Sequence, residues 1–523
     1  MYDIIIKNGT VIDGTGKPMY KADVGIQEDK IKEIGNLQNE GADTIISAQG
    51  QYVCPGFVDV NNHSDTYWRI FLDPDLESLI YQGITTIIGG NCGSSLAPLV
   101  NQETIQSIQK WANIEDINLN WLKMGEFLSE IEKRKISVNF ATLVGHSTLR
   151  RGLIGDQTRG LNYREVRMMD KMLKNAMKEG ALGLSTGLVY SHAKLAKEEE
   201  IIELAKTVKK YDGVYVTHVR GEMHDLLEAV EEAVRTAQAA GVKLQISHLK
   251  AMGEKNWNLL DEALGMIEAA GNSGLDVNFD VYPYTTTGSV LYILLPDWVS
   301  EGGKKMMIQR LKDPEIRAQV IGEMKENNFD YSKITVAISA LDKTLTRKNI
   351  SEIAISQGKT IEETVVDILI ASNGRVITNM EVLSEKNVAK LIRHPMAIIS
   401  SNGSGYYIKH KESGEMVHPR NFGTFPRVLA KYVKKEGILS WEEAIHKMSG
   451  KPANKFGIEK RGIIREGNFA DVLILNPDKI QDLATEENPY QYSCGISWTL
   501  VNGKVILENG KYNGRREGEV IRR

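Results

Sequence analysis

The feature that most constrains the fold of this chain is the alternation of strand-like and helix-like segments through its middle. Apolar residues recur at helical spacing over residues 163–179 and 225–240, and a glycine follows each segment. Between segments of this kind lie short apolar runs with the length of buried strands. This alternation predicts an α/β protein with a parallel sheet and crossover helices.

Eight segments are predicted strands, and eight parallel strands close a (β/α)8 barrel of the TIM type. We predict this barrel over residues 55–454. The interval between the last two strands exceeds an ordinary crossover, so we expect an inserted subdomain around residues 288–393. The predicted strands are 57–61, 85–89, 138–144, 181–186, 214–218, 244–248, 275–282 and 397–401.

Both ends of the chain are rich in short β-like runs. Near the start these are residues 3–7 and 22–26, with turn signals at Asn8-Gly9 and Asp13-Gly14. Near the end, residues 471–475 and 499–506 repeat the pattern, and Asn502-Gly503 interrupts the second run. We therefore predict one small β-sandwich domain formed from both termini, residues 1–54 and 455–523.

The composition excludes several classes of protein. The chain has 523 residues, a net charge of −4 and 42% hydrophobic residues, ordinary values for a globular protein that give no reason to expect a nucleic-acid partner. No apolar run is long enough to span a bilayer, and the start lacks the features of a signal peptide. Three scattered cysteines suit a reducing compartment. We expect a cytoplasmic protein without a membrane partner, and the sequence leaves its oligomeric state open.

A cysteine and two histidines fall at or just beyond the ends of predicted strands. Cys92 follows the second strand, while His218 and His248 close the fifth and the sixth. Barrel enzymes place their active sites at this edge. A lone histidine is more often satisfied by a local hydrogen bond. Two at equivalent strand ends, with a cysteine on an earlier strand, favour a tetrahedral zinc site that keeps one position for water.

Other polar residues occupy similar places. His63 and Asp65 follow the first predicted strand, where they would extend the metal site or contact a substrate. Tyr190 and Tyr282 are candidate donors to a carbonyl oxygen that becomes negatively charged during a reaction. Either tyrosine is equally consistent with aromatic packing at the barrel mouth, and for Tyr284 we expect packing.

Several motifs together carry a resemblance to a known family. Over nearly its whole length the chain resembles the N-acyl-D-amino-acid deacylases, or D-aminoacylases, of the amidohydrolase superfamily. The coverage of the longer motifs makes a chance match implausible. The motifs are Gly89-Gly-Asn-Cys-Gly, Leu143-Val-Gly-His, Gly183-Leu-Ser-Thr-Gly-Leu-Val-Tyr, Ser247-His-Leu-Lys-Ala-Met-Gly, Asp280-Val-Tyr-Pro-Tyr, His418-Pro-Arg and Gly423-Thr-Phe-Pro-Arg.

The resemblance implies a fold, a cofactor and a substrate. The fold is a barrel with a small β-domain, and zinc is held by the positions that match Cys92, His218 and His248. Lys250 matches the position that holds a substrate carboxylate, although a loop lysine is also often solvated. Arg420 is expected to pair with a carboxylate, either of the substrate or in a structural ion pair.

The chain departs from the family at two places. The family has His-x-His after the first strand, where this chain has Asn61 and His63, and a catalytic aspartate after the eighth strand, where it has Asn402. An amide does not titrate, and loss of a positioned general base costs about 10²- to 10⁴-fold in rate. Both asparagines are also poorer metal ligands. We expect one tightly held zinc rather than two.

The resulting prediction is a zinc-dependent amidohydrolase that hydrolyses N-acyl-D-amino acids or related small molecules. Hydrolysis is expected to be impaired at Asn402 unless His63 or Asp65 serves as the base. Two alternatives remain: a non-hydrolytic isomerase, cyclase or acyl transferase on the same scaffold, and a catalytically silent ligand-binding protein. The asparagine is either native or was introduced to trap a bound state.

Overall fold

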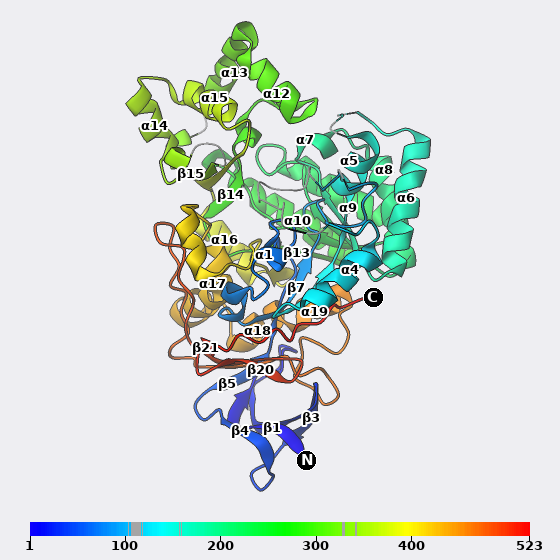
Figure 1. The fold of residues 1–523 in the computed structure, drawn as a ribbon, viewed down its shortest axis with the longest axis vertical. Coiled ribbons are helices and arrows are strands. Elements are labelled where there is room, and N and C mark those ends of the chain that lie inside the picture. Colours follow the sequence, from blue (N-terminus) through cyan, green and yellow to red (C-terminus); the bar gives the residue numbers. More distant parts are fainter. Residues whose placement is uncertain are drawn as a thin grey trace.

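The structure is a computed structural model that describes residues 1–102, 104–105, 117, 119–155, 157, 159–326, 330–339 and 343–523. Strands from both ends of the chain gather at one end of the molecule, and helices α12, α13, α14 and α15 lie at the other (Figure 1). The parallel strands and their covering helices lie between them. The molecule is therefore a mixed α/β protein.

The central strands form two parallel sheets. In the first sheet the order is β6-β7-β8, and in the second it is β17-β13-β12-β11-β10-β9. All pairings within both sheets are parallel. The strands are β6 (Phe57–Asp59), β7 (Ile84–Gly89), β8 (Asn139–Thr142), β9 (Val144–Gly145), β10 (Gly183–Gly187), β11 (Val214–His218), β12 (Lys243–Ile246), β13 (Val277–Val281) and β17 (Ala397–Ile399).

Each of the eight predicted segments contains a strand, but the segment 138–144 is divided. Its first part, β8, pairs with β7, whereas its second part, β9, pairs with β10. At the break, the backbone N–H of Leu143 donates to the carbonyl of Gly89 at 3.0 Å. At the opposite edges of the two sheets, Asn62 and Gly403 form a parallel bridge. The two sheets therefore adjoin at both edges.

The two helices predicted from apolar spacing are present. Helix α6 (Tyr163–Lys178) begins with a capping box, in which the Asn162 side chain accepts from the backbone of Glu165, and buries Met169 and Leu173. Helix α9 (Leu226–Ala240) ends at Gly241, whose φ of 65° suits glycine. The other helices of the central region are α1 (Arg69–Leu72), α2 (Glu77–Ile80), α4 (Met124–Arg134), α5 (His146–Ile154), α7 (Ser191–Lys194), α8 (Glu198–Lys210), α10 (Leu259–Asn272), α16 (Glu385–Arg393), α17 (Arg420–Arg427), α18 (Trp441–Met448) and α19 (Gly450–Phe456).

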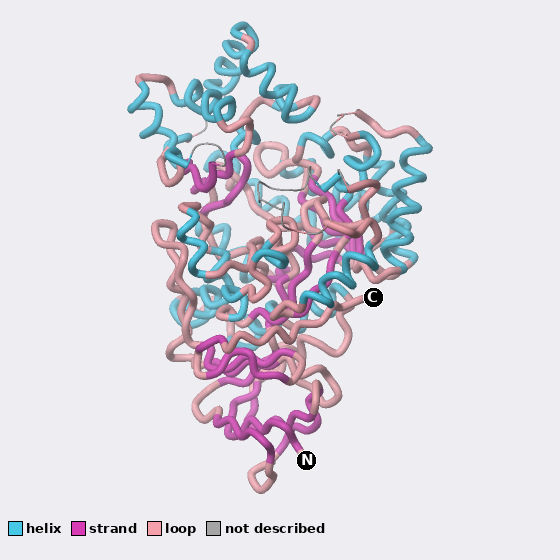
Figure 2. The backbone as a smooth tube through the Cα atoms, in the orientation of Figure 1, coloured by secondary structure: helices cyan, strands magenta, loops and turns pink. Residues whose placement is uncertain are grey.

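Strands from both termini form one nine-stranded sheet (Figure 2). Its centre is the antiparallel pair of β5 and β18, which joins the two ends of the chain. Aliphatic residues from both ends share one core, including Ile6, Val24, Val472 and Leu500. The strands are β1 (Tyr2–Val11), β2 (Tyr20–Gln27), β3 (Lys30–Gly35), β4 (Ala42–Ser47), β5 (Tyr52–Pro55), β18 (Val472–Leu475), β19 (Ile496–Val501), β20 (Lys504–Glu508) and β21 (Lys511–Tyr512).

One predicted turn in this sheet is wrong. Asn8-Gly9 lies inside β1, where the register with β2 shifts between Ile6 and Gly9, so the pair forms a bulge. A Cβ atom on Gly9 would lie 2.5 Å from the Val53 side chain, which explains the glycine by close packing. The Asn502-Gly503 turn is confirmed, since it joins β19 to β20.

Between β13 and β17 the chain forms an additional small sheet with its own helices. Its antiparallel strand order is β14-β16-β15. Helix α16 follows this unit and contacts β13 and β17 of the central sheet. None of the helices in the described part of the chain is long and apolar enough to cross a membrane. The unit contains β14 (Thr286–Val290), α11 (Asp297–Ser300), α12 (Gly303–Lys312), α13 (Pro314–Glu326), β15 (Ile334–Ser339), α14 (Ile350–Gln357), α15 (Ile361–Ala371) and β16 (Val376–Glu381).

Candidate metal centre

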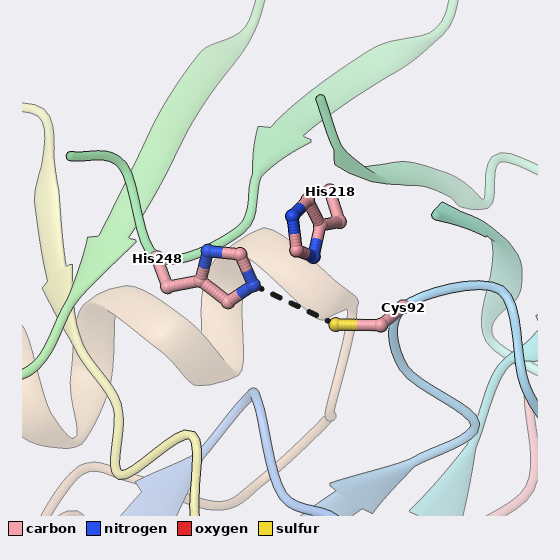
Figure 3. A group of neighbouring side chains, drawn as sticks. All are labelled: Cys92, His218 and His248. Carbon is pink, nitrogen blue, oxygen red and sulfur yellow. Dashed lines mark hydrogen bonds between the residues drawn. The ribbon is translucent and has the colours of Figure 1, made fainter. Parts of the chain in front are cut away.

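Cys92, His218 and His248 meet at the carboxyl ends of the parallel strands (Figure 3). They come from the loop after β7, the last residue of β11 and the turn after β12. All three are buried, and one ligand atom from each lies within 4.8 Å of the others. The Cys92 Sγ atom is 3.6 Å from Nε2 of His248. The structure thus brings together the three residues predicted as zinc ligands.

The backbone turns sharply at two of these three residues. Cys92 and His248 have φ values of 51° and 37°, in the left-handed region that side chains other than those of glycine and asparagine rarely adopt. Glycines with positive φ, Gly90 and Gly93, flank Cys92. Strained conformations of this kind persist where the surrounding structure enforces them, and they concentrate at functional sites.

His218 provides a test of whether these residues fit a metal. Both nitrogens of its ring are buried without a hydrogen-bond partner among the described residues. The nearest recorded carboxylate oxygen, in Glu222, is 3.5 Å from Nε2, which is too far for a good hydrogen bond. A buried polar atom without a partner is costly. A thiol and two imidazoles form a donor set that suits zinc, and one ion would satisfy this histidine.

The environment of His248 keeps its ring neutral. Burial lowers the pKa of His248 to about 3, with further lowering by the charges of Lys250 and His218, although Glu222 acts in the opposite direction. A neutral imidazole is the form that binds a metal. Nδ1 of His248 lies 2.9 Å from Nζ of Lys250 and 3.2 Å from Oε1 of Glu222, while Nε2, on the other side of the ring, faces Cys92.

Glu222 is a site residue that the sequence analysis missed. Its carboxylate contacts Lys250 and lies beside both histidines. Burial alone would raise the pKa of Glu222, but Lys250, His218 and His248 together hold it well below its usual range. In the sequence, Glu222 is distinguished only by its position four residues after His218. Sequence alone does not show that the loop after His218 turns the Glu222 side chain toward the two histidines.

His63 and Asn402 form a direct contact beside this group. Nε2 of His63 lies 2.9 Å from Oδ1 of Asn402 and 3.9 Å from Sγ of Cys92. Because an amide oxygen only accepts, the His63 ring donates in this pair. Asp65 lies deeper, where its Oδ2 accepts from the backbone N–H of Gly90 at 2.7 Å. Asp65 therefore orders the loop that carries Cys92.

The amide of Asn61 is engaged with a neighbouring carboxylate. Its Nδ2 donates to Oδ1 of Asp280 at 3.2 Å, and the side chain is completely buried. The same Asp280 oxygen accepts from the backbone N–H of His248 at 3.0 Å. At the position of the family histidine, the structure thus places an amide that supports the His248 turn.

Two of the predicted substrate residues, Tyr190 and Lys250, lie against the metal candidates. The ring of Tyr190 lies 5.3 Å from that of His218. Lys250 is 6% exposed and ion-paired with Glu222, so it is not a solvated loop lysine. The hydroxyl of Tyr282 lies 3.0 Å from Oγ1 of Thr287, its hydrogen-bond acceptor.

Arg420 is the most unusual of these residues. Its guanidinium carbon lies 5.2 Å from the centre of the Tyr282 ring. Its Nε and Nη1 atoms are buried and have no hydrogen-bond partner among the described residues. A guanidinium presents a planar pair of donors that matches a carboxylate. This arrangement favours a bound carboxylate over the structural ion pair considered from the sequence.

Comparisons with known proteins agree with this geometry. A model of the Amidohydrolase family matches residues 44–507. The D-aminoacylase of Alcaligenes xylosoxydans xylosoxydans is 32% identical over 522 residues, which cover 100% of this chain and 98% of that protein. A structure of D-aminoacylase, solved in work on the role of its binuclear metal centre, has a TM-score of 0.85 at 32% identity and covers 100% of both chains.

A further relative was solved with zinc. This N-acyl-D-glutamate deacylase from Bordetella bronchiseptica, complexed with zinc and a phosphonate mimic of the tetrahedral intermediate, has a TM-score of 0.84 at 28% identity. The similarity covers 100% of both chains. Because the family match spans most of the chain and the relatives align over its full length, the chain belongs to the amidohydrolase family.

Proposed function

We propose that this chain is a zinc-dependent hydrolase that cleaves the amide bond of N-acyl-D-amino acids. The observation that carries the proposal is the convergence of Cys92, His218 and His248 at one edge of the parallel strands, with His218 lacking hydrogen-bond partners among the described residues. Full-length similarity to a D-aminoacylase and to an N-acyl-D-glutamate deacylase supports the substrate class. The natural partner is then a small molecule.

The same proposal includes a single zinc ion in a closed barrel. One D-aminoacylase relative has a binuclear centre, but here the Asn61 amide donates to Asp280 and the His63 ring donates to Asn402. Both contacts disfavour a second ion. The adjoining edges of the two parallel sheets support an eight-strand barrel over residues 55–454. Residues 1–54 and 455–523 form the small β-domain, and the unit around 288–393 is an insertion.

Each of the side chains around the proposed zinc site would have a separate role in the reaction. A bound zinc supplies polarisation of the amide carbonyl and a water of lowered pKa. Arg420 and Lys250 hold the substrate carboxylate, which fixes the acylated nitrogen relative to the strand ends. Tyr190 donates toward the carbonyl oxygen as negative charge develops on it, whereas the hydroxyl of Tyr282 donates to Thr287. Burial raises the pKa of Tyr190 well above its usual range, so its hydroxyl remains a donor at neutral pH.

The proposed site has an asparagine, Asn402, at the position where the family has the aspartate that accepts a proton. Asn402 cannot accept a proton, and Asp65 is engaged by the Gly90 backbone. His63 contacts both Asn402 and Cys92 and is the nearer of the two predicted substitutes to the metal candidates, but because its Nε2 donates to Asn402, only Nδ1 could accept a proton. The asparagine also supports a second candidate function, a non-hydrolytic or silent site, because it replaces the group on which hydrolysis depends.

Two measurements on the purified chain test the proposal. Elemental analysis should find one zinc per chain, and amine release should favour N-acetyl-D- over N-acetyl-L-amino acids. Absence of metal would overturn the assignment of Cys92, His218 and His248. Zinc without amine release, in the wild type and after Asn402→Asp with or without Asn61→His, would favour the second candidate function.

A further inference from the structure

The Asn402-Gly403 pair follows β17 after two serines, beside the candidate metal centre. Glycine has no Cβ, so its backbone nitrogen is the least hindered in approaching the side chain of a preceding asparagine. We propose that Asn402 is a self-modification site, at which the folded chain converts its own asparagine amide into aspartate. The modification is independent of the proposed function, and only its catalytic consequence rests on that function.

The reaction consumes one water and releases one ammonia. The Gly403 nitrogen loses its proton and attacks Cγ of Asn402, which forms a five-membered succinimide ring and expels the side-chain nitrogen as ammonia. Water then adds to Cγ and breaks its bond to the Gly403 nitrogen, which regains a proton. The peptide bond is restored, and residue 402 carries a carboxyl group.

The amide carbon of Asn402 is activated by a neighbouring donor. The His63 ring donates from Nε2 to Oδ1 of Asn402 at 2.9 Å, and both residues are buried. Negative charge develops on this oxygen when Cγ is attacked. A fixed donor at such an oxygen, in a site with little water, is the arrangement by which enzymes stabilise tetrahedral intermediates.

The Gly403 nitrogen has a path for its proton. Its N–H donates to Oγ of Ser401 at 2.9 Å, and the Ser401 hydroxyl in turn donates to a carboxylate oxygen of Asp59. Burial raises the pKa of Asp59 to about 6, although its hydrogen bonds with Asn62 and Ser401 act in the opposite direction. A buried carboxyl with this pKa can accept and return a proton near neutral pH.

The fold accommodates aspartate at this position better than its isomer. Asn402 has a φ of 46°, and aspartate tolerates the left-handed region as asparagine does. Isoaspartate would add one atom to the backbone. That atom would displace the carbonyl of Gly403, which accepts from the backbone N–H of His63 at 2.7 Å, and the N–H of Ser404, which donates to Asn421 at 2.7 Å. Aspartate is therefore the expected product.

The chain contains a matched internal control, the buried pair Asn502-Gly503. Asn502 resembles Asn402 in exposure, 6% against 7%, and in φ, 50° against 46°. Its side chain donates through Nδ2, to Asn139 and to Glu517, and its Oδ1 has no partner among the described residues. The Gly503 nitrogen donates to a backbone carbonyl. This pair thus lacks both a donor to the asparagine Oδ1 and a hydroxyl that could take the proton of the glycine N–H.

Peptide mass spectrometry of the full-length protein, sampled during incubation at neutral pH, tests the inference. Conversion raises the mass of a peptide by about 1 Da, and Asn509-Gly510, a turn whose asparagine is exposed, reports the rate at the protein surface. We expect Asn402 to convert at least about tenfold faster than Asn502, the factor that ~1.4 kcal/mol of transition-state stabilisation supplies. Equal rates at the two buried sites would overturn the inference.

Variants separate assistance by the fold from the intrinsic rate of an Asn-Gly pair. Ser401→Ala and His63→Ala should each slow conversion at Asn402 and leave Asn502 unchanged, while Ser401→Thr, which retains the hydroxyl, should preserve the rate. Circular dichroism confirms that each variant is folded. An unchanged rate at Asn402 in both alanine variants would contradict the assigned roles.

Activity distinguishes failure of the modification from failure of the proposed function. The rate of amine release from N-acetyl-D-amino acids should rise with the fraction of chains in which Asn402 has been converted. The Asn402→Asp variant should show, from the start, the rate that the fully converted protein reaches. Conversion without a gain in activity would leave the modification intact and overturn its catalytic role. A gain in activity without conversion would overturn the inference itself.

Discussion

Oε1 of Glu222 lies 3.2 Å from Nδ1 of His248, and the same carboxylate is ion-paired with Lys250. One buried acid therefore joins a proposed metal ligand to a proposed substrate-binding residue. Because the two contacts share one carboxylate oxygen, a change at Lys250 alters the environment of His248. Substrate binding and metal binding are expected to be coupled through Glu222.

The first prediction concerns the orientation of His248. Glu222→Gln should weaken zinc binding by about 10- to 100-fold, because Glu222 holds Lys250 against Nδ1 of His248, and loss of such an outer partner of a ligating imidazole weakens metal binding to this degree. Competition with a chromogenic chelator measures the affinity. Glu198→Gln is the matched control, because Glu198 forms its ion pair with Arg235 at the exposed surface. Equal zinc affinity in wild type and Glu222→Gln would remove Glu222 from the site.

The second prediction concerns the thiol ligand. Cys92→Ser should abolish the rise in melting temperature that added zinc produces, because a ligand stabilises the folded state by an amount that increases with its affinity for that state. Cys494 is exposed and provides a matched control in Cys494→Ser. Thermal unfolding of chelator-treated protein with and without zinc measures the shift. A full zinc shift in Cys92→Ser would show that the ion binds elsewhere.

The third prediction concerns the Arg420 guanidinium, whose Nε and Nη1 atoms have no hydrogen-bond partner among the described residues. Arg420→Met should lower kcat/KM for N-acetyl-D-amino acids by about 10- to 100-fold, as expected from the loss of a charged hydrogen bond of ~1.5–3 kcal/mol. The corresponding carboxamide substrates provide the control, because they lack the charge that Arg420 would bind. An equal loss on both substrate series would assign Arg420 a purely structural role.

The fourth prediction concerns a buried lysine outside the site. Lys447 is 5% exposed, donates to the carbonyls of Ile392 and His394 at the end of α16, and burial lowers its pKa to about 7. Between about pH 7 and its ordinary value of 10.5, the unfolded chain holds the extra proton. The free energy of unfolding therefore rises with pH across this window.

Urea unfolding as a function of pH measures this contribution. Lys447→Met should make the rise in unfolding free energy between about pH 7 and about pH 10 shallower. Lys210→Met, at the exposed end of α8, is the control. A slope unchanged from wild type would show that Lys447 remains charged in the folded protein.

The sequence predicts those site residues whose positions follow from the ends of the parallel strands. Cys92, His218 and His248 were predictable because parallel strands place their carboxyl ends at one edge, and the structure brings the three together. Glu222 could not be predicted as a site residue, because its contact with Lys250 depends on the path of a loop. Loop direction follows from packing across elements far apart in sequence.

The same distinction applies to the fold. The helical spacing of residues 163–179 and the apolar character of the eight strands are local properties, and they predicted the elements correctly. Asn8-Gly9 has the composition of a turn, yet it forms a bulge because Val53 packs where a side chain would be. Whether an Asn-Gly pair reverses the chain or bends a strand is decided by a partner far away in the sequence.

The pairing of β5 with β18 has a consequence for biosynthesis. Strand β5 ends at Pro55 and its partner begins at Val472, so the partner leaves the ribosome only after nearly the whole chain has been made. Until then the edge of β5 presents unpaired backbone groups, which are a template for aggregation. Chaperones that shield nascent strands should therefore raise the soluble yield of this protein, and premature termination before β18 should leave its N-terminal strands exposed.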